Sequence, residues 1–430
     1  MSLMRIDDLF HFEKGILQSS KCTEGEFDFI TASSEWKTHN EYTHDCEALV
    51  FAAAASGSLG RTHYVNGKFI SSDLCFIITA KDPIKLPIDL KFYHMIFNEF
   101  KNDIVNSTKA GTSKEAIGMK AFGNYKLPYF EINKQIDTKV QFVNMQDSKV
   151  ELNVELTHQI DLIKQMRQAF LREAMQGKLV KSTNTKETGQ QFLAKIKAEK
   201  SQLIAEKKLK KEKELAPISE DEIPFEIPEY WTWCRLGEIC TLITDGKHGD
   251  CKNEPNSGYY FLSAKDIQNG QFIYDGARQI TYDDFLETHR RTNLEPGDLC
   301  IVNTGATIGK SAFAPEDEKT KNTTFQKSVA VIKVIKEHTN MRFVENFIIN
   351  ETPRLLKKSR GSAINNLLLG DMRNTLFPLP PLHEQEQIVA KLEELMAFCD
   401  GLEQSIKESQ GYNEKLLQQV LREALQGKEV

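Results

Sequence analysis

The sequence predicts a mixed α/β protein in which two similar globular domains are separated by a pair of long antiparallel helices. The octapeptide LREAMQGK at 171–178 returns as LREALQGK at 421–428, so 421 less 171 gives an offset of 250 residues. Each copy ends in an amphipathic helical segment. A duplicated unit of this size predicts two domains related by a pseudo-twofold axis, and therefore two similar binding surfaces. The same offset aligns five earlier pairs without a gap: Phe97 with Phe347, Gly111 with Gly361, Asn124 with Asn374, Pro128 with Pro378 and Gln135 with Gln385.

Composition places the chain among globular proteins. Of its 430 residues, 40% are hydrophobic and 27% are charged, which is typical of a folded protein rather than a disordered one. No apolar run approaches 18 residues, so the sequence predicts no membrane span. The first residues carry Asp7, Asp8 and Glu13 where a signal peptide needs an apolar core.

The eight cysteines contain no C-x-x-C pair, so we expect reduced thiols, no metal site and a cytoplasmic protein. The formal net charge of −6 does not by itself indicate a nucleic-acid partner. Net charge governs long-range steering and does not determine what one face of the protein can bind. Evidence for nucleic-acid binding must therefore come from local basic clusters.

The repeat divides the chain into four parts: residues 1–145, 146–215, 216–380 and 381–430. The first and third parts read as globular, because short β-rich runs alternate with helical stretches and glycine-containing turns. The β-rich runs are 74–79, 299–302 and 329–335, and the clearest helical stretch is 89–104.

The last part is predicted to be one helix beginning at Pro380 and Pro381, where a missing N–H costs nothing. Its apolar residues alternate steps of four and three, which is a heptad seam that needs a partner helix. Gly401 and Gly411 predict bending or fraying, since each costs about 1 kcal/mol against alanine. The seam comprises Ile388, Leu392, Leu395, Cys399, Leu402 and Ile406, and resumes with Leu416, Val420 and Ala424.

The central part offers the partner, since its apolar residues have a similar spacing and also follow a similar globular unit. We therefore favour an intramolecular antiparallel helix pair over two separate surface helices. Residues 186–213 follow, with nine lysines against four glutamates. This lysine-rich segment is predicted to be a solvent-exposed helix. The alternative is a rigid segment that faces phosphates or a partner protein. The central stripe comprises Leu152, Leu156, Ile160, Ile163, Met166, Phe170 and Ala174.

The enzymatic motifs in the chain are incomplete. Gly305–Ser311 resembles a Walker A loop but has three residues between its glycines instead of four. Glu35-Trp36-Lys37, with Asp28 upstream, resembles part of a nuclease site but has no counterpart in the second half. The sequence contains no dinucleotide fingerprint, no Asn-Pro-Pro-aromatic or Asp-Pro-Pro-Tyr motif for methyl transfer to an amino group, and no H-E-x-x-H pair. We expect no catalytic site in this chain.

A family resemblance covers essentially the whole length. The second half carries IPEYWTWCRLGEI at 227–239, TDGKHGD at 244–250, YFLSAKDI at 260–267, EPGDLCI at 295–301, NTGATIGKSA at 303–312 and SRGSAINNLLLGDMRNTLFPLPPLHEQEQIV at 359–389. The first half is a degenerate copy, with DFITAS at 28–33, ALVFAAAASGSLGRTHY at 48–64 and STKAGTSKEAIGMKAFGNYKLP at 107–128. In this order, the motifs resemble the DNA-specificity subunit of type I restriction–modification enzymes. The first half departs from the pattern at 129–134, where its long helix should begin.

The resemblance implies a division of labour. Residues 1–145 and 216–380 would be target-recognition domains that each read half of a bipartite DNA sequence. The helical regions 146–215 and 381–430 would act as a ruler between them. Separate modification subunits would bring S-adenosylmethionine and methylate adenine, and restriction subunits would use ATP and Mg to cut DNA. A helix of about 25–30 residues is about 40 Å long, close to the 34–36 Å that separates successive major grooves.

Candidate DNA-contacting residues come from matched polar loops. Arginine can bind guanine and asparagine adenine in a bidentate manner, whereas lysine mostly contacts phosphate. The alternative for each is an exposed polar loop residue, and Arg360 beside Gly361 is the first choice. The first domain offers Ser58, Arg61, Thr62, His63, Lys109, Thr112, Ser113 and Lys114. The second offers Lys247, His248, Arg290, Arg291, Thr304, Thr307, Lys310, Lys357, Lys358, Arg360, Asn365 and Asn366.

Two other functions remain open at this point. One is a DNA-binding scaffold of similar architecture in another nucleoprotein complex. The other is a stand-alone enzyme, which the incomplete catalytic motifs disfavour. Co-purifying methyltransferase subunits would separate the first alternative from a specificity subunit, and an activity screen of the isolated chain would test the second.

Overall fold

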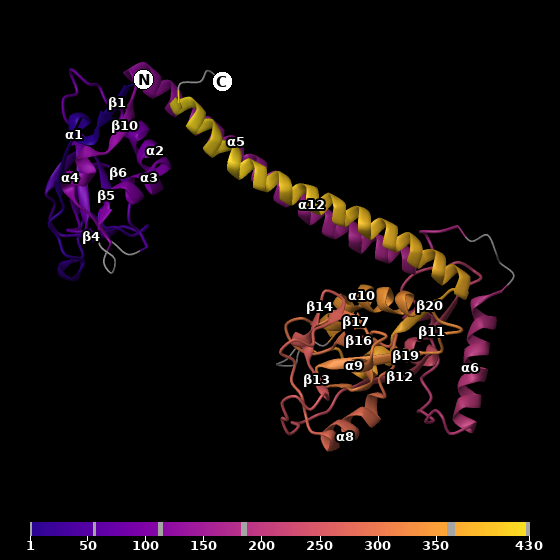
Figure 1. Cartoon of the computed structure of the whole chain (residues 1–430). Coiled ribbons are helices and arrows are strands. Elements are labelled where there is room, and N and C mark those ends of the chain that lie inside the picture. Colours follow the sequence, from indigo (N-terminus) through magenta and orange to yellow (C-terminus); the bar gives the residue numbers. More distant parts are fainter. Residues whose placement is uncertain (1, 55–56, 111–114, 182–186, 359–365, 427–430) are drawn as a thin grey trace. The chain divides into compact units, whose positions relative to one another are not determined.

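A computed structural model describes residues 2–54, 57–110, 115–181, 187–358 and 366–426 (Figure 1). The chain forms two compact units. Unit 1 comprises Met1–Gln159 with Ser405–Val430, and unit 2 comprises Ile160–Gln404. The long helices α5, Ile132–Met175, and α12, Leu382–Gln426, each contribute to both units.

Unit 1 is built on a six-stranded sheet in the order β2-β7-β5-β6-β3-β4. Its neighbouring strands are antiparallel except for the parallel pair β3 and β6. The elements are β1 Ser2–Arg5, α1 Ile6–Leu9, β2 Phe10–Lys14, a 3₁₀ turn Ser19–Lys21, β3 Phe27–Ile30, β4 Lys37–His39, β5 His44–Ala52, β6 Thr62–Ser71, β7 Cys75–Ala80, α2 Leu90–Glu99, α3 Lys101–Thr108, β8 Lys109–Ala110, β9 Ala116–Ile117, α4 Met119–Asn124 and β10 Lys126–Tyr129.

The core of unit 1 is aromatic. Phe10 packs edge-on against Tyr93 at 5.0 Å between ring centroids, and Phe51 lies 4.6 Å from Phe122. All four side chains are fully or almost fully buried. Burying one such side chain contributes roughly 1.5–3 kcal/mol, so this cluster fixes α2 and α4 against one face of the sheet.

Unit 2 contains a four-stranded antiparallel sheet in the order β12-β19-β16-β17 and a parallel pair, β13 with β18. Its elements are α6 Gly189–Ala205, a 3₁₀ turn Glu220–Glu222, β11 Thr232–Arg235, α7 Leu236–Ile239, β12 Cys240–Asp245, β13 Tyr260–Leu262, a 3₁₀ turn Ala264–Asp266, β14 Ile267–Gln268, β15 Gln271–Phe272, α8 Tyr282–Thr292, β16 Leu299–Val302, β17 Ser311–Phe313, α9 Glu318–Lys321, β18 Thr323–Phe325, β19 Val329–Val334, α10 Met341–Lys358, α11 Leu369–Asn374 and β20 Leu376–Leu379.

The duplication is visible in the folded units. Three elements of unit 1 begin 250 residues before their counterparts in unit 2. Helix α4 begins at 119 and α11 at 369, strand β10 at 126 and β20 at 376, and helix α5 at 132 and α12 at 382. Strand β10 pairs with β1 as β20 pairs with β11. Each long helix therefore leaves its unit from an equivalent strand, although residues 129–134 lack the sequence motif found in the second half.

A buried glutamine secures the start of each long helix. In unit 1, Gln135 Oε1 accepts the Asp89 N–H at 2.9 Å, and its amide nitrogen donates to Phe130 O at 2.7 Å and Pro87 O at 3.0 Å. In unit 2, Gln385 Oε1 accepts the Asn340 N–H at 2.9 Å, and its amide nitrogen donates to Pro380 O at 3.0 Å. Both side chains are fully buried. The repeated glutamine thus ties helix α5 or α12 to its domain.

The two long helices pair in an antiparallel manner, as expected. In unit 2, Arg167 donates to Glu403 at 2.7 Å and to Asp400 at 2.6 Å. In unit 1, Asn413 donates to Asn153 Oδ1 at 3.2 Å. Polar side chains therefore occupy part of the contact between the helices, where asparagine pairs are known to specify register.

Several expectations for the helices were wrong in detail. The helices have 44 and 45 residues, longer than the expected 25–30. Helix α12 is unbroken through Gly401 and Gly411, because pairing with α5 outweighs the low helix propensity of glycine. Leu152, Leu402 and Leu416 do not join the seam, since they are 45%, 36% and 55% exposed. The side chains of Val420 and Ala424 lie outside the described part of the chain.

The predicted central helical segment is two helices. Helix α5 ends at Met175, and Gly177 follows with φ +69°, a left-handed conformation that terminates helices. Helix α6 begins after Thr188, whose side chain forms a capping box with Gln191. Its buried Phe192 and Ile196 join the core of unit 2, so α6 is a packed helix of that unit. In the described ranges no helix has the length and apolar character needed to cross a membrane.

Candidate nucleic-acid interface

The loop between β5 and β6 in unit 1 is a hairpin held by three backbone hydrogen bonds. The Ala52 N–H donates to Arg61 O at 2.8 Å, the Gly60 N–H to Ala52 O at 2.8 Å, and the Arg61 N–H to Ser58 O at 3.0 Å. Gly60 has φ +80°, and a Cβ there would lie 2.6 Å from Val105 Cγ2. Glycine is therefore required at this position, and the loop presents Arg61 directly after it.

The loop between β16 and β17 in unit 2 repeats this construction. The Val302 N–H donates to Lys310 O at 2.8 Å, the Gly309 N–H to Val302 O at 2.9 Å, and the Lys310 N–H to Thr307 O at 3.2 Å. Gly309 has φ +91°. Lys310 is exposed and occupies the position that Arg61 has in unit 1. The Walker-like segment Gly305–Ser311 is thus the turn of a β-hairpin and leads into strand β17. A phosphate-binding loop of the Walker type would lead into a helix instead.

A second candidate loop returns to the hairpin in both units. The Ile117 N–H donates to Ala53 O at 2.8 Å, and the Leu367 N–H donates to Asn303 O at 2.7 Å. In unit 2 the Thr304 hydroxyl also donates to Asn366 Oδ1 at 2.9 Å. In each unit the structure therefore brings together loop residues that are 64 positions apart in the sequence. Five predicted residues of these loops, Thr112, Ser113, Lys114, Arg360 and Asn365, and the side chain of Lys358, lie outside the described residues.

One end of the unit 2 sheet gathers three further candidates. Strands β12 and β16 both lie antiparallel to β19, so their carboxyl ends lie at the same end of the sheet. At the end of β12, Asp245 accepts hydrogen bonds from the Arg291 guanidinium and from His248 Nε2, the latter at 2.9 Å. Lys247 lies 3.2 Å from Asp284 and 3.1 Å from Glu287. Burial opposes its charged form, but the two carboxylates raise the pKa of Lys247.

These contacts change how the β12 candidates are interpreted. Lys247 and Arg291 are paired with carboxylates, so much of their charge is balanced within the protein, and His248 is hydrogen-bonded to Asp245. Arg290, in the last turn of α8, is exposed. Arg290 and Lys310 thus present their charged groups more openly than the Asp245 cluster does.

The unit 1 candidates differ from one another in accessibility. Thr62 is only 3% exposed, and its carbonyl accepts from His94 Nε2 at 2.9 Å, so a DNA contact by its side chain was wrongly expected. Lys109 pairs with Glu115 at 2.8 Å. Arg61 donates to Ala32 O at 3.0 Å and to Ser58 Oγ at 3.3 Å, which joins the hairpin to the loop after β3.

His63 is fully engaged by its neighbours. Its Nε2–H donates to Ser33 O at 2.8 Å, and its Nδ1 accepts the Trp36 indole N–H at 3.2 Å. Burial lowers the pKa of His63, which favours this neutral ring. Both ring nitrogens are used, so His63 supports the loop and is not available to a base. Trp36 was not among the predicted residues, because Glu35-Trp36-Lys37 suggested only a nuclease fragment.

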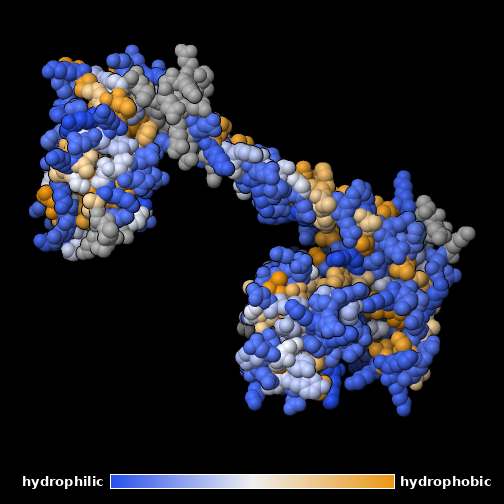
Figure 2. All heavy atoms as spheres, viewed as in Figure 1, coloured by the Kyte–Doolittle hydropathy of each residue, from blue (hydrophilic) through white to orange (hydrophobic). Residues whose placement is uncertain are grey.

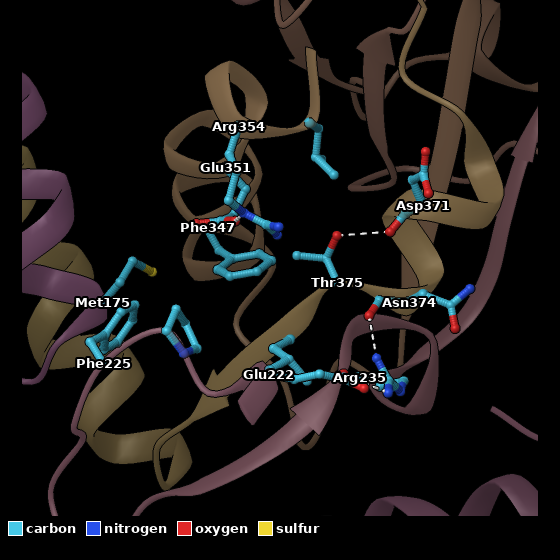
Figure 3. A pocket seen from close by; sticks show the side chains of 13 residues that line it. Met175, Glu222, Phe225, Arg235, Phe347, Glu351, Arg354, Asp371, Asn374 and Thr375 are labelled. Atoms are coloured by element: carbon cyan, nitrogen blue, oxygen red, sulfur yellow. Dashed lines mark hydrogen bonds and ion pairs between the residues drawn. The ribbon is translucent and has the colours of Figure 1, made fainter. Parts of the chain in front are cut away.

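A cavity of about 380 Å³ lies in unit 2 beside the end of α5 (Figure 3). Its buried cation, Arg235, donates to Asn374 O and to Glu222, both at 2.8 Å. Thr375 donates to Asp371 O at 2.8 Å. These polar groups bond to the protein itself and hold β11 and α11 together, so this cavity reads as structural.

A basic groove of about 730 Å³ adjoins that cavity. Its cations Lys164 and Arg172 come from α5, and Arg354 and Lys357 come from α10. Glu351 balances Arg354 by an ion pair. Lys357, one of the predicted DNA-contacting residues, lies in the last turn of α10 and lines this groove. Uncharged phosphate-binding groups are also present, because Gln165, Gln168, Gln176 and Asn350 line the same groove.

An apolar stripe forms a different candidate surface on α5. Ile136, Val140, Val143, Val150 and Val154 follow heptad spacing and are 41% to 66% exposed. Figure 2 shows apolar residues among polar ones along the helix pair. An exposed heptad stripe on an already paired helix indicates a surface for further helices.

The described residues contain no group of three or more histidine, cysteine, aspartate or glutamate side chains arranged to hold a metal ion. All eight cysteines are free thiols, and six of them are buried.

Known proteins resemble the chain along its whole length. The sequence profile described as Type I restriction modification DNA specificity domain matches residues 1–160 and 228–409. The EcoAI type I restriction enzyme specificity subunit of Escherichia coli is 30% identical over 255 residues, which cover 56% of this chain and 41% of that protein. The EcoDI specificity subunit of the same organism is 21% identical over 427 residues, covering 99% and 87%.

Solved structures share the fold. A chain from a study of complex assembly and conformational transition in the type I R-M system has a TM-score of 0.60 at 16% identity, covering 100% of this chain and 98% of that one. The HsdS subunit from Thermoanaerobacter tengcongensis gives a TM-score of 0.57 at 15% identity, covering 100% and 97%. The chain spans less than half of the EcoAI and EcoEI specificity subunits, at 41% and 42% of their lengths.

Proposed function

The chain belongs to the type I restriction modification DNA specificity family, and we propose that its two units each read one half of a bipartite, asymmetric DNA sequence. The observation that carries this proposal is the hairpin built twice with the same hydrogen bonds, which presents Arg61 in unit 1 and Lys310 in unit 2. Equivalent loops with unlike side chains suit two half-sites of unlike sequence. Such loops can contact base edges while neighbouring lysines contact phosphates.

The second part of the proposal concerns partner subunits. The chain would recognise DNA without catalysing a reaction, and methyltransferase subunits would dock along the helix pair and bring S-adenosylmethionine. Restriction subunits using ATP and Mg would join that assembly. The exposed heptad stripe from Ile136 to Val154 supports docking, since its five apolar side chains remain open to solvent.

Co-expression with the methyltransferase subunits of a type I system tests the proposal. Sequencing of modified adenines in host DNA should reveal one motif made of two unlike halves separated by a spacer. The change Arg61→Ala should relax or weaken one half, and Lys310→Ala the other, because each residue belongs to a different unit. Methylation by the isolated chain, or a motif in which both variants alter the same half, would contradict the proposal.

A further inference from the structure

Trp36 is the most exposed of the three tryptophans. Its side chain is 39% exposed, in the loop that follows β3, whereas Trp231 is 5% exposed in the core of unit 2. Tryptophan is a costly residue to leave in water, and aromatic anchors are enriched where proteins bind partners. The packing of unit 1 does not account for this exposed indole.

The orientation of the indole is fixed by His63. The Trp36 N–H donates to His63 Nδ1 at 3.2 Å, and the two rings meet edge-to-face at 82° with centroids 5.8 Å apart. His63 Nε2 faces the Ser33 carbonyl at 2.8 Å, and a carbonyl can only accept. His63 therefore carries its proton on Nε2 and leaves Nδ1 free to accept from Trp36. In this contact the Trp36 N–H is therefore always the donor, and His63 Nδ1 is always the acceptor.

Trp36 belongs to the same loop cluster as the candidate hairpin. Arg61 Nη1 donates to Ala32 O at 3.0 Å, which ties the loop after β3 to the β5–β6 loop. His63 is two residues beyond Arg61 and contacts both Ser33 and Trp36. A DNA duplex contacted by Arg61 would therefore lie close to the indole.

The corresponding loop of unit 2 is built differently. After β13, Ser263 donates to Asp266 through its N–H at 2.8 Å and its hydroxyl at 2.9 Å. Residues 263–266, Ser-Ala-Lys-Asp, include no aromatic side chain. An exposed indole is thus a feature of the unit 1 loop, and it is the kind of difference that makes two half-sites unlike.

We propose that Trp36 is a base-contacting residue of unit 1 that binds the methyl group of a thymine, with His63 as its positioning residue. The inference rests on the proposed DNA-reading function. With its N–H given to His63, the indole has no donor left and offers only apolar surface. In an intact duplex, the apolar group on a base edge in the major groove is the thymine C5-methyl group.

The experiment uses the full chain in complex with its methyltransferase subunits and duplexes carrying the determined target. Each thymine of the half-site read by unit 1 is replaced in turn by deoxyuridine, which removes only the methyl group. At one position the wild-type complex should bind the thymine duplex roughly fourfold more tightly, as expected for one buried methyl group. Trp36→Ala should bind both duplexes equally, and Trp36→Phe should retain part of the preference.

Two variants of His63 test whether this residue orients the Trp36 indole or only stabilises the fold of unit 1. His63→Ala should reduce the thymine preference, and His63→Gln should restore part of it, since a glutamine oxygen can accept the indole N–H. Tyr42 is the matched control, because it is a similarly exposed aromatic residue of unit 1 at 42% and packs against Phe27 instead. Tyr42→Ala should keep the wild-type preference. Circular dichroism establishes that each variant is folded.

The proposal is overturned if Trp36→Ala retains the thymine preference, or if the half-site read by unit 1 contains no A·T pair. It is also overturned if deoxyuridine is tolerated at every position by the wild-type complex. Failure of the proposed function itself would look different. In that case the wild-type complex would show no bipartite methylated motif.

Discussion

Replacing the glutamine that fixes α12 to unit 2 should destabilise that unit measurably. Gln385 is fully buried, accepts the Asn340 N–H at 2.9 Å and donates to Pro380 O at 3.0 Å. In Gln385→Leu both backbone groups lose their partner. An unpaired buried polar group costs about 1–3 kcal/mol, and the gain from an apolar side chain offsets part of this. We expect a net loss of about 2–4 kcal/mol in the free energy of unfolding.

Urea denaturation followed by tryptophan fluorescence measures this loss. Trp36 belongs to unit 1, and Trp231 and Trp233 belong to unit 2, so a Trp36→Phe background reports on unit 2. The control is Gln165→Leu, an exposed position on α5 within unit 2, which should change stability by less than about 0.5 kcal/mol. If Gln385→Leu is no more destabilising than Gln165→Leu, the buried amide does not hold the helix start.

Two further perturbations follow from the same contacts. Arg167→Ala removes the ion pairs to Glu403 and Asp400, so we expect a loss of about 1–2 kcal/mol that shrinks at high salt. Urea denaturation at low and high salt measures it, and a loss that does not depend on salt would argue against an electrostatic contact. Arg172→Gln with Lys357→Gln removes two cations of the basic groove. If both contact phosphates, the slope of log binding constant against log salt should fall by about 1.8, with the methylated sequence unchanged. Lys195→Gln with Lys391→Gln, which do not line the groove, is the control; equal slopes in the two double variants would exclude phosphate contacts there.

The repeat in the sequence was enough to predict the duplicated fold and the paired helices. The polar loops matched in the sequence, which hold Ser58 to His63 and Thr304 to Lys310, are both hairpins in the structure, with a glycine of positive φ before the cation. Register and length were harder to predict. Heptad spacing identified apolar stripes but not which stripe faces the partner, so Leu152 and Leu402 were assigned to the contact and are exposed.

The accessibility of the candidate site residues could not be read from the sequence, because it depends on tertiary neighbours. Thr62 looks like a polar loop residue in the sequence, yet it begins β6 and its side chain is buried. Lys247 and Arg291 look like free cations, but the fold brings Asp284, Glu287 and Asp245 to them. Trp36 was noticed only as part of an incomplete nuclease motif, because its contact with His63 joins residues 27 positions apart.

The most direct test exchanges residues 1–145 for those of another family member and then sequences the methylated sites in host DNA. It asks whether each unit recognises its own half of the target. We predict that one half of the methylated motif changes, while the other half, read by unit 2, is kept. A change in both halves, or in neither, would contradict the assignment of one half-site to each unit.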